Sequence, residues 1–146
     1  MIGAIGDTPY NIVYAIHLFS VILGTGMAFL APYMAVKARR QSGRGVQEFV
    51  DEAASMIIFP ALLVAGCAGG ALVGLSADAY DFQQTWLSIG GAIWLATLVF
   101  SALAYPPRWL RLFNLGEDRR RQLGGLLHIS LAIMLVLMTW KFGVGG

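Results

Sequence analysis

The sequence predicts an all-α membrane protein, built as an antiparallel up-and-down four-helix transmembrane bundle. Its 146 residues are 58% hydrophobic and only 12% charged, with a mean hydropathy of +0.69. Four stretches reach the length of about 20 apolar residues that crosses ~30 Å of hydrocarbon. The ten Lys and Arg and eight Asp and Glu residues all lie outside the cores of those stretches. We therefore predict a single transmembrane domain over residues 1–146.

The first predicted span covers residues 11–36. The turn-forming Asp7-Thr8-Pro9 precedes it, and Lys37, with further basic residues, closes it. No Lys or Arg precedes this segment, and it has no clear small-residue cleavage site. We expect a retained span and not a signal peptide.

A short amphipathic helix is predicted at residues 47–56, after a break at Ser42 and Gly43. Apolar residues recur there at helical spacing, opposite Glu48, Asp51 and Glu52. Such a segment is typical of a helix that lies on the membrane surface. We expect this interfacial helix to be separate from the second span.

The other three spans are predicted at residues 55–77, 85–105 and 123–140. The second span contains Pro60 near its start and is rich in glycine and alanine. Pro106-Pro107 ends the third span, because proline has no N–H and disfavours helix before it. A basic segment from Arg108 to Arg121 precedes the fourth span.

Basic residues are distributed very unevenly between the connections. Four Lys or Arg follow the first span, none follow the second, five follow the third and one follows the fourth. The positive-inside rule then places loops 37–54 and 106–122 in the cytoplasm and both termini outside the cell (inner) membrane. The lipid bilayer is the expected partner, and the segregated charge indicates topology, not nucleic-acid binding.

His17 is the main candidate site residue. It lies about six residues inside the first span, on the face that carries Ser20, Gly24 and Ala28, so it should face the bundle. An ionisable residue inside a span is a functional hypothesis by default, and a neutral imidazole can ligate haem iron or a soft metal. The alternative is an imidazole bonded to a backbone carbonyl, Ser or Tyr, which holds two helices in register.

His128 is the second candidate, about five residues inside the other surface. From a rise of about 1.5 Å per residue, the two histidines should differ in depth by ~14 Å, which argues against one haem with both as axial ligands. His128 could instead extend toward the nearby interface.

The remaining sulfur-containing side chains are expected to fill space. Cys67 is the single cysteine and should be a small packing residue. The methionines could suggest copper, but they show no Met-x-x-Met or Cys-x-x-Cys spacing, so core packing is the preferred interpretation.

The first span, with Tyr14-Ala-Ile-His17-Leu-Phe, Gly24-x-Gly26 and Ala31-Pro32-Tyr33-Met34, resembles that of a bacterial family of small four-span integral membrane proteins. The closing Leu137-Met138-Thr139-Trp140-Lys141 resembles that family as well. A histidine followed fifteen residues later by a proline is also similar to the HemJ-type protoporphyrinogen oxidases, and more distantly to CopD-type copper-resistance proteins. The resemblance implies a haem or porphyrin contact at His17 alone. The HemJ-type lysine in the third span is absent, so the likeness does not extend to porphyrinogen oxidation.

Three functions follow from these observations. In the first, His17 ligates a b-type haem or contacts a porphyrin, in a cavity opened by Ser20, Gly24 and the glycines of the second span, with His128 as a further candidate ligand. In the second, the chain is an accessory or structural subunit of a larger membrane complex or a homo-oligomer. In the third, it transports copper or a small molecule, with His17 as a metal ligand. We expect an accessory or cofactor-associated protein and not an independent enzyme.

Overall fold

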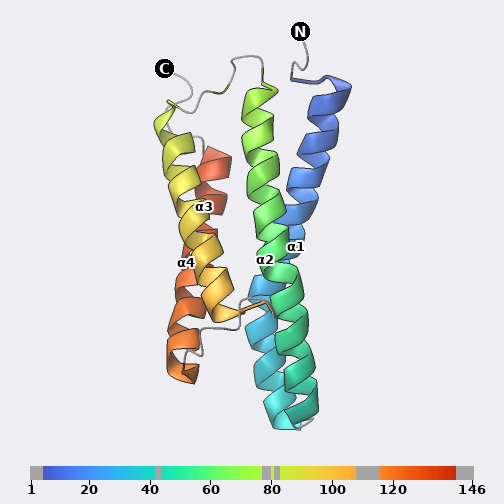
Figure 1. Cartoon of the computed structure of the whole chain (residues 1–146), viewed down its shortest axis with the longest axis vertical. Coiled ribbons are helices and arrows are strands. Elements are labelled where there is room, and N and C mark those ends of the chain that lie inside the picture. The colour runs from blue at the N-terminus through green and yellow to red at the C-terminus, as the bar shows by residue number, and fades with distance from the viewer. Residues whose placement is uncertain (1–4, 42–43, 77–79, 81–82, 108–115, 141–146) are drawn as a thin grey trace.

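A computed structural model of the chain describes residues 5–41, 44–76, 80, 83–107 and 116–140. Four helices make up these residues: α1 (Thr8–Gln41), α2 (Arg44–Gly74), α3 (Thr85–Ala104) and α4 (Glu117–Trp140). Successive helices run in opposite directions, and the start of α1 and the end of α4 lie at the same end of the bundle (Figure 1). The predicted all-α, four-helix architecture is confirmed.

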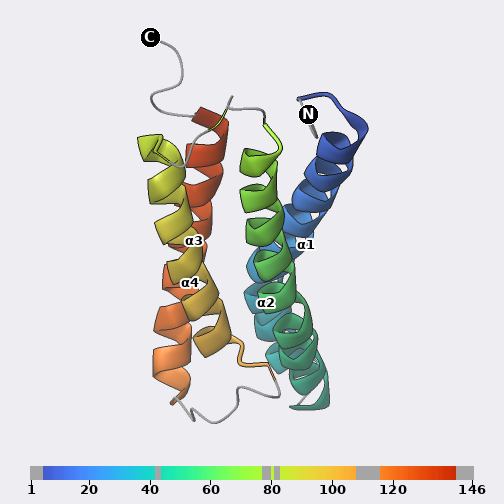
Figure 2. The same cartoon turned by 45° about the horizontal axis from the view of Figure 1, so that its top comes forward.

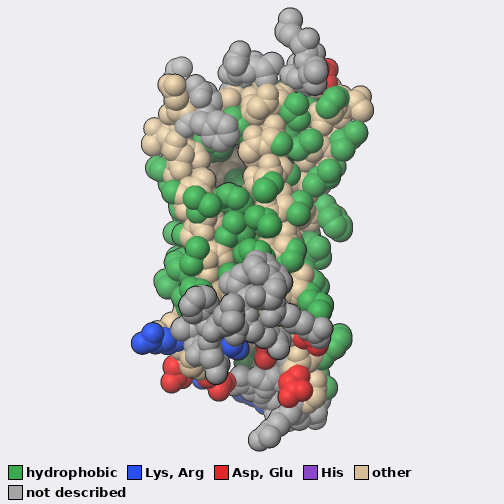
Figure 3. All heavy atoms as spheres, in the orientation of Figure 1, with side chains coloured by type: hydrophobic (Ala, Val, Ile, Leu, Met, Phe, Trp, Pro, Cys, Tyr) green, Lys and Arg blue, Asp and Glu red, His purple; other side chains and the backbone are tan. Residues whose placement is uncertain are grey.

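All four helices are long and apolar enough to cross a membrane. The spanning segments are Thr8–Ala38, Glu48–Gly74, Thr85–Ala104 and Glu117–Trp140. Large apolar side chains such as Phe19 and Ile22 are exposed on the outside of the bundle, where acyl chains would surround them. Figure 3 shows a band of apolar side chains, with most charged side chains gathered at one end. The chain is therefore a small polytopic membrane protein.

The predicted interfacial helix does not exist as a separate element. Residues 47–56 belong to α2, which runs without interruption from Arg44. The reason lies in its buried face, where Val50, Ala54, Ile58 and Leu62 follow one another at intervals of four and are all 2% exposed or less. That single stripe keeps the segment packed against the bundle and continuous with the span.

Two other predicted limits change. Helix α4 begins at Glu117 and not near residue 123, so the basic run Arg119-Arg120-Arg121 is helical. Glu117 and Asp118 in its first turn suit the positive end of the helix dipole, and Glu117 pairs with Arg121 at 3.2 Å. Residues 37–41 and 44–54 of the predicted loop 37–54 are helical, whereas residues 42–43, 77–79 and 108–115 lie outside the described residues.

The helices pack as two pairs. Helix α1 lies along α2, and α3 lies along α4, while the contacts between the pairs are fewer (Figure 2). The main core cluster joins both pairs and consists of Ala28, Ala31, Ala54, Ile58, Leu62, Leu127, Leu131 and Met134. Small residues allow close approach within the first pair, because a Cβ at Gly24 would lie only 3.1 Å from the Leu62 side chain.

Candidate functional site: a histidine-lined pocket between the helix pairs

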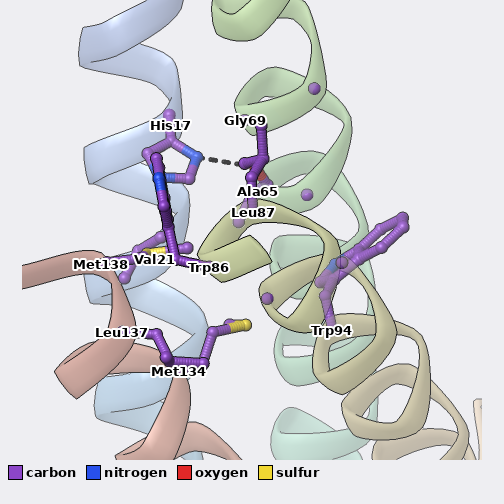
Figure 4. Close-up of a pocket in the computed structure, with 14 residues that line it drawn as sticks. His17, Val21, Ala65, Gly69, Trp86, Leu87, Trp94, Met134, Leu137 and Met138 are labelled. Carbon is purple, nitrogen blue, oxygen red and sulfur yellow. Dashed lines mark hydrogen bonds between the residues drawn. The ribbon is translucent and has the colours of Figure 1, made fainter. Parts of the chain in front are cut away.

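His17 is buried in the contact between α1 and α2. Its side chain is 8% exposed, and Nδ1 lies 2.7 Å from the carbonyl oxygen of Ala65 (Figure 4). The position follows from the sequence, since Ser20, Gly24 and Ala28 continue the same face of α1 and are buried too. The prediction that His17 faces the bundle and not the lipid is confirmed.

The hydrogen bond to Ala65 determines which ring nitrogen of His17 carries the proton. A carbonyl oxygen can only accept, so Nδ1 must donate. In the neutral imidazole, Nε2 then keeps a free lone pair. Among the described residues, Nε2 has no hydrogen-bond partner. His17 therefore offers one uncommitted acceptor nitrogen inside the bundle.

Gly69 makes this hydrogen bond possible. In an α-helix the Ala65 carbonyl points along the axis toward the N–H of residue 69. A Cβ at Gly69 would lie 3.2 Å from Cε1 and 3.4 Å from Nδ1 of His17. Any larger side chain would push the imidazole away from the carbonyl. The glycine-rich composition of α2 thus positions the histidine.

A pocket of about 100 Å³ lies against His17, between the two helix pairs. All four helices contribute to its lining: His17 and Val21; Ala65, Gly66, Gly69 and Gly70; Trp86, Leu87, Gly90, Gly91 and Trp94; Met134, Leu137 and Met138. Figure 3 shows a hollow between α2 and the α3–α4 pair, in the half of the bundle away from the charged end. Apart from the imidazole, the lining is almost wholly apolar.

Trp94 fixes α3 against α2 at the same level. Its Nε1–H donates to the carbonyl oxygen of Leu62 at 2.9 Å. A Cβ at Gly66, four residues after the acceptor, would overlap the indole ring. Leu62 and Gly66 are four residues apart, as are Ala65 and Gly69 at the His17 contact. Trp86, the other indole of the pocket, donates its own Nε1–H to Gln84 at 3.0 Å.

His128 occupies a different place in the fold. Its Nε2 lies 2.9 Å from the carbonyl oxygen of Ala28 on α1, and its ring packs against Phe29 with the ring centroids 4.9 Å apart. Pro32, four residues after Ala28, has no N–H to give to that carbonyl. His128 supplies the missing donor, which is how helices in lipid tolerate an internal proline.

The two histidines do not meet. The Ala28 carbonyl that binds His128 is eleven residues along α1 from His17, or roughly 16 Å at 1.5 Å per residue. His128 does not line the pocket, and neither do Ser20, which is buried, and Gly24, which lies against Leu62 of α2. His17 is thus the one pocket residue among the four sequence-predicted site residues.

Sequence reasoning missed the aromatic part of the site. Trp86, Gly90 and Trp94 recur every four residues, which places them on one face of α3. The sequence shows this spacing, but it does not show which helix the face packs against. Cys67, expected to pack between helices, is exposed on α2, so that prediction was wrong.

Neither a search for clusters of metal ligands nor comparison with known proteins assigns a function to the pocket. Within the described ranges, no three His, Cys, Asp or Glu residues come together to hold a metal ion. No family model matches the chain, and no curated protein or solved structure matches it. The likeness to HemJ-type and CopD-type proteins therefore stays a prediction.

Proposed function

We propose that this protein binds a membrane-soluble ligand in the His17 pocket, and that a b-type haem or a porphyrin is the first candidate. One observation carries the proposal: a buried imidazole donates Nδ1–H to a backbone carbonyl, and its Nε2, which has no partner among the described residues, lies beside a pocket. Histidines that ligate metals in proteins usually have their second nitrogen held in this way.

The donor chemistry fits an axial haem ligand, with Nε2 of His17 toward the iron. Ala65 would orient the ring and increase its basicity, and Trp86 and Leu87 would contribute apolar surface. A bound haem would supply one-electron redox chemistry. The size of the pocket fits less well, because about 100 Å³ is far below the ~300–1,000 Å³ of most cofactor sites. A tetrapyrrole would require the two helix pairs to move apart.

A reduced-minus-oxidised absorbance spectrum of the detergent-purified protein tests the haem proposal. We expect a Soret band that is lost in His17→Ala and kept in His128→Ala, because His128 lies outside the pocket. The His128 variant controls for general destabilisation. The absence of a Soret band, or a band that is unchanged in His17→Ala, would rule haem out.

Copper binding is a second candidate, favoured by one observation. Met134 and Met138 line the same pocket as His17, and thioether and imidazole ligands both suit Cu(I). Metal analysis should then find one copper per chain, reduced in Met134→Leu. Copper below unit stoichiometry would exclude it.

The subunit role stays open as an alternative proposal. Gly26 and Gly91 are exposed, and no heavy atom lies within 4 Å of the position that a Cβ would take, so another helix could approach there. Native gels of gently solubilised membranes should then show a complex larger than the protein alone. Migration only as a monomer or small homo-oligomer would count against it.

We also propose that both termini face the outside. The structure supports this by placing the end of α1 and the basic start of α4 at one end of the bundle (Figure 1). The positive-inside rule assigns that end to the cytoplasm.

A further inference from the structure

The polar atoms of the His17 pocket restrict which ligand can occupy it. Three of the fourteen lining residues carry a nitrogen in the side chain: His17, Trp86 and Trp94. The two indole N–H groups are already donated, to Gln84 and to the Leu62 carbonyl. Within the described part of the chain, Nε2 of His17 is the one side-chain nitrogen of the lining without a hydrogen-bond partner, and in the neutral ring it accepts.

Water is a poor occupant for such a site. A buried water is held by two to four polar partners, whereas this lining offers it one side-chain acceptor among apolar surfaces. A fully apolar molecule would leave the imidazole nitrogen unpaired, which buried polar atoms rarely are. The lining therefore selects a mainly apolar molecule with one well-placed hydrogen-bond donor.

The size and shape of the pocket narrow the choice further. Its volume of about 100 Å³ is below the ~150 Å³ of an apolar cavity that binds benzene, so it admits no more than one six-membered ring. Gly70, Gly90 and Gly91 leave open space at their Cβ positions, so the helix backbones form flat walls. Trp86 and Trp94, roughly 12 Å apart along α3, offer indole rings on which an aromatic ring can stack.

From these features we propose that the pocket binds the hydroxylated aromatic ring of a membrane-soluble molecule, the chemistry of a reduced quinone, with the ring O–H donated to Nε2 of His17. The inference rests on the proposal that this pocket is a ligand site. It replaces the tetrapyrrole by a single ring, which needs far less room than the four rings of a tetrapyrrole. The quinone form, which has carbonyl acceptors in place of the hydroxyls, cannot pair with Nε2 and binds more weakly.

The test is equilibrium binding of ubiquinol-1 and ubiquinone-1 to the detergent-purified chain at pH 8, with quenching of tryptophan fluorescence as the readout. We expect one saturable site with at least tenfold tighter binding of ubiquinol-1. Equal affinity for the two redox forms, or binding that does not saturate, would overturn the proposal.

Two variants separate the site from the fold. His17→Phe keeps a ring but removes the acceptor, so it should abolish the preference for ubiquinol-1. Gly90→Leu fills the pocket without touching His17 and should weaken binding at least tenfold, whereas Gly26→Leu, outside the pocket, should leave it unchanged. A redox preference that persists in His17→Phe, or equal effects of the two leucine substitutions, would contradict the assignment. Loss of ubiquinol-1 binding alongside a His17-dependent Soret band would refute this inference and leave the haem proposal standing.

Discussion

At the scale of single residues, three side chains join helices by the same device. His17, Trp94 and His128 each donate a ring N–H to a backbone carbonyl of a neighbouring helix. In every case the residue four positions after the acceptor is glycine or proline: Gly69, Gly66 and Pro32. Glycine leaves the carbonyl accessible, and proline leaves it without its usual partner. These bonds hold three imidazole and indole rings between the helices of the bundle.

The pairing of His128 with the carbonyl freed by Pro32 predicts coupled effects on stability. His128→Ala alone should destabilise the bundle by about 1–3 kcal/mol, because it leaves the Ala28 carbonyl unsatisfied. In a Pro32→Ala background the restored N–H satisfies that carbonyl, so the same substitution should cost about 0.5–1.5 kcal/mol less. Unfolding equilibria of the four proteins of this cycle in detergent measure the coupling.

Pro60 provides the matched control for that cycle. It lies inside α2, away from the His128 contact, so Pro60→Ala and His128→Ala should be additive. Additivity of Pro32→Ala with His128→Ala as well would show that the proline and the histidine are unrelated.

The environment of Tyr105, just past the end of α3, predicts that the stability of the fold falls at high pH. Burial, and then the neighbouring Asp51, raises the pKa of its phenol above the usual value near 10. The protonated phenol is thus favoured in the folded state, and its stabilising contribution is complete below pH ~10 and lost as the pH rises through the folded-state pKa. Melting temperatures from pH 8 to 11 should fall less steeply for Tyr105→Phe than for the unmodified protein. Parallel curves would disprove this linkage.

At the scale of elements, the shape of the pocket depends on how closely α2 approaches α1 and α3. Helix α2 carries glycines toward both α1 and α3, and α3 returns an indole into the space at Gly66. The continuous stripe of α2 from Val50 to Leu62 holds this helix against α1, and so fixes the level at which Ala65 meets His17.

Two glycines on successive turns of α2 should respond in opposite ways to alanine. Gly66→Ala forces its methyl group into the Trp94 ring and should destabilise the bundle by about 1–3 kcal/mol. Gly70→Ala meets open space and should be neutral or stabilising by up to ~1 kcal/mol, since alanine favours helix. Thermal unfolding in detergent compares them, and equal stabilities of the two variants would refute the close α2–α3 contact at Gly66.

At the scale of the whole molecule, the chain is two helix pairs with a pocket between them. Its exterior is apolar, with charge gathered at one end, and all four helices are long and apolar enough to cross a bilayer (Figure 3). The pocket lies in the opposite half, near the starts of α1 and α3 and the ends of α2 and α4.

Cysteine labelling tests the proposed orientation. In a Cys67→Ala background, Gln83→Cys should react with a membrane-impermeant maleimide on intact cells, because residue 83 lies at the end assigned to the outside. Glu48→Cys, at the charged end, should react only after the membrane is permeabilised. The reverse pattern would invert the topology, and labelling of both positions in intact cells would contradict the spanning arrangement.

The sequence alone determined the four spans, their order, the segregation of charge and the inward direction of His17. Hydropathy and helical periodicity are read from a short window of sequence, so these features can be predicted without knowing which helices pack together. Tertiary structure decided that residues 47–56 continue α2, that Trp86 and Trp94 share a pocket with His17, and that His128 binds the carbonyl freed by Pro32. Each of these depends on the register between helices far apart in sequence, which is set by the fit of side chains against glycine and proline positions of the facing helix.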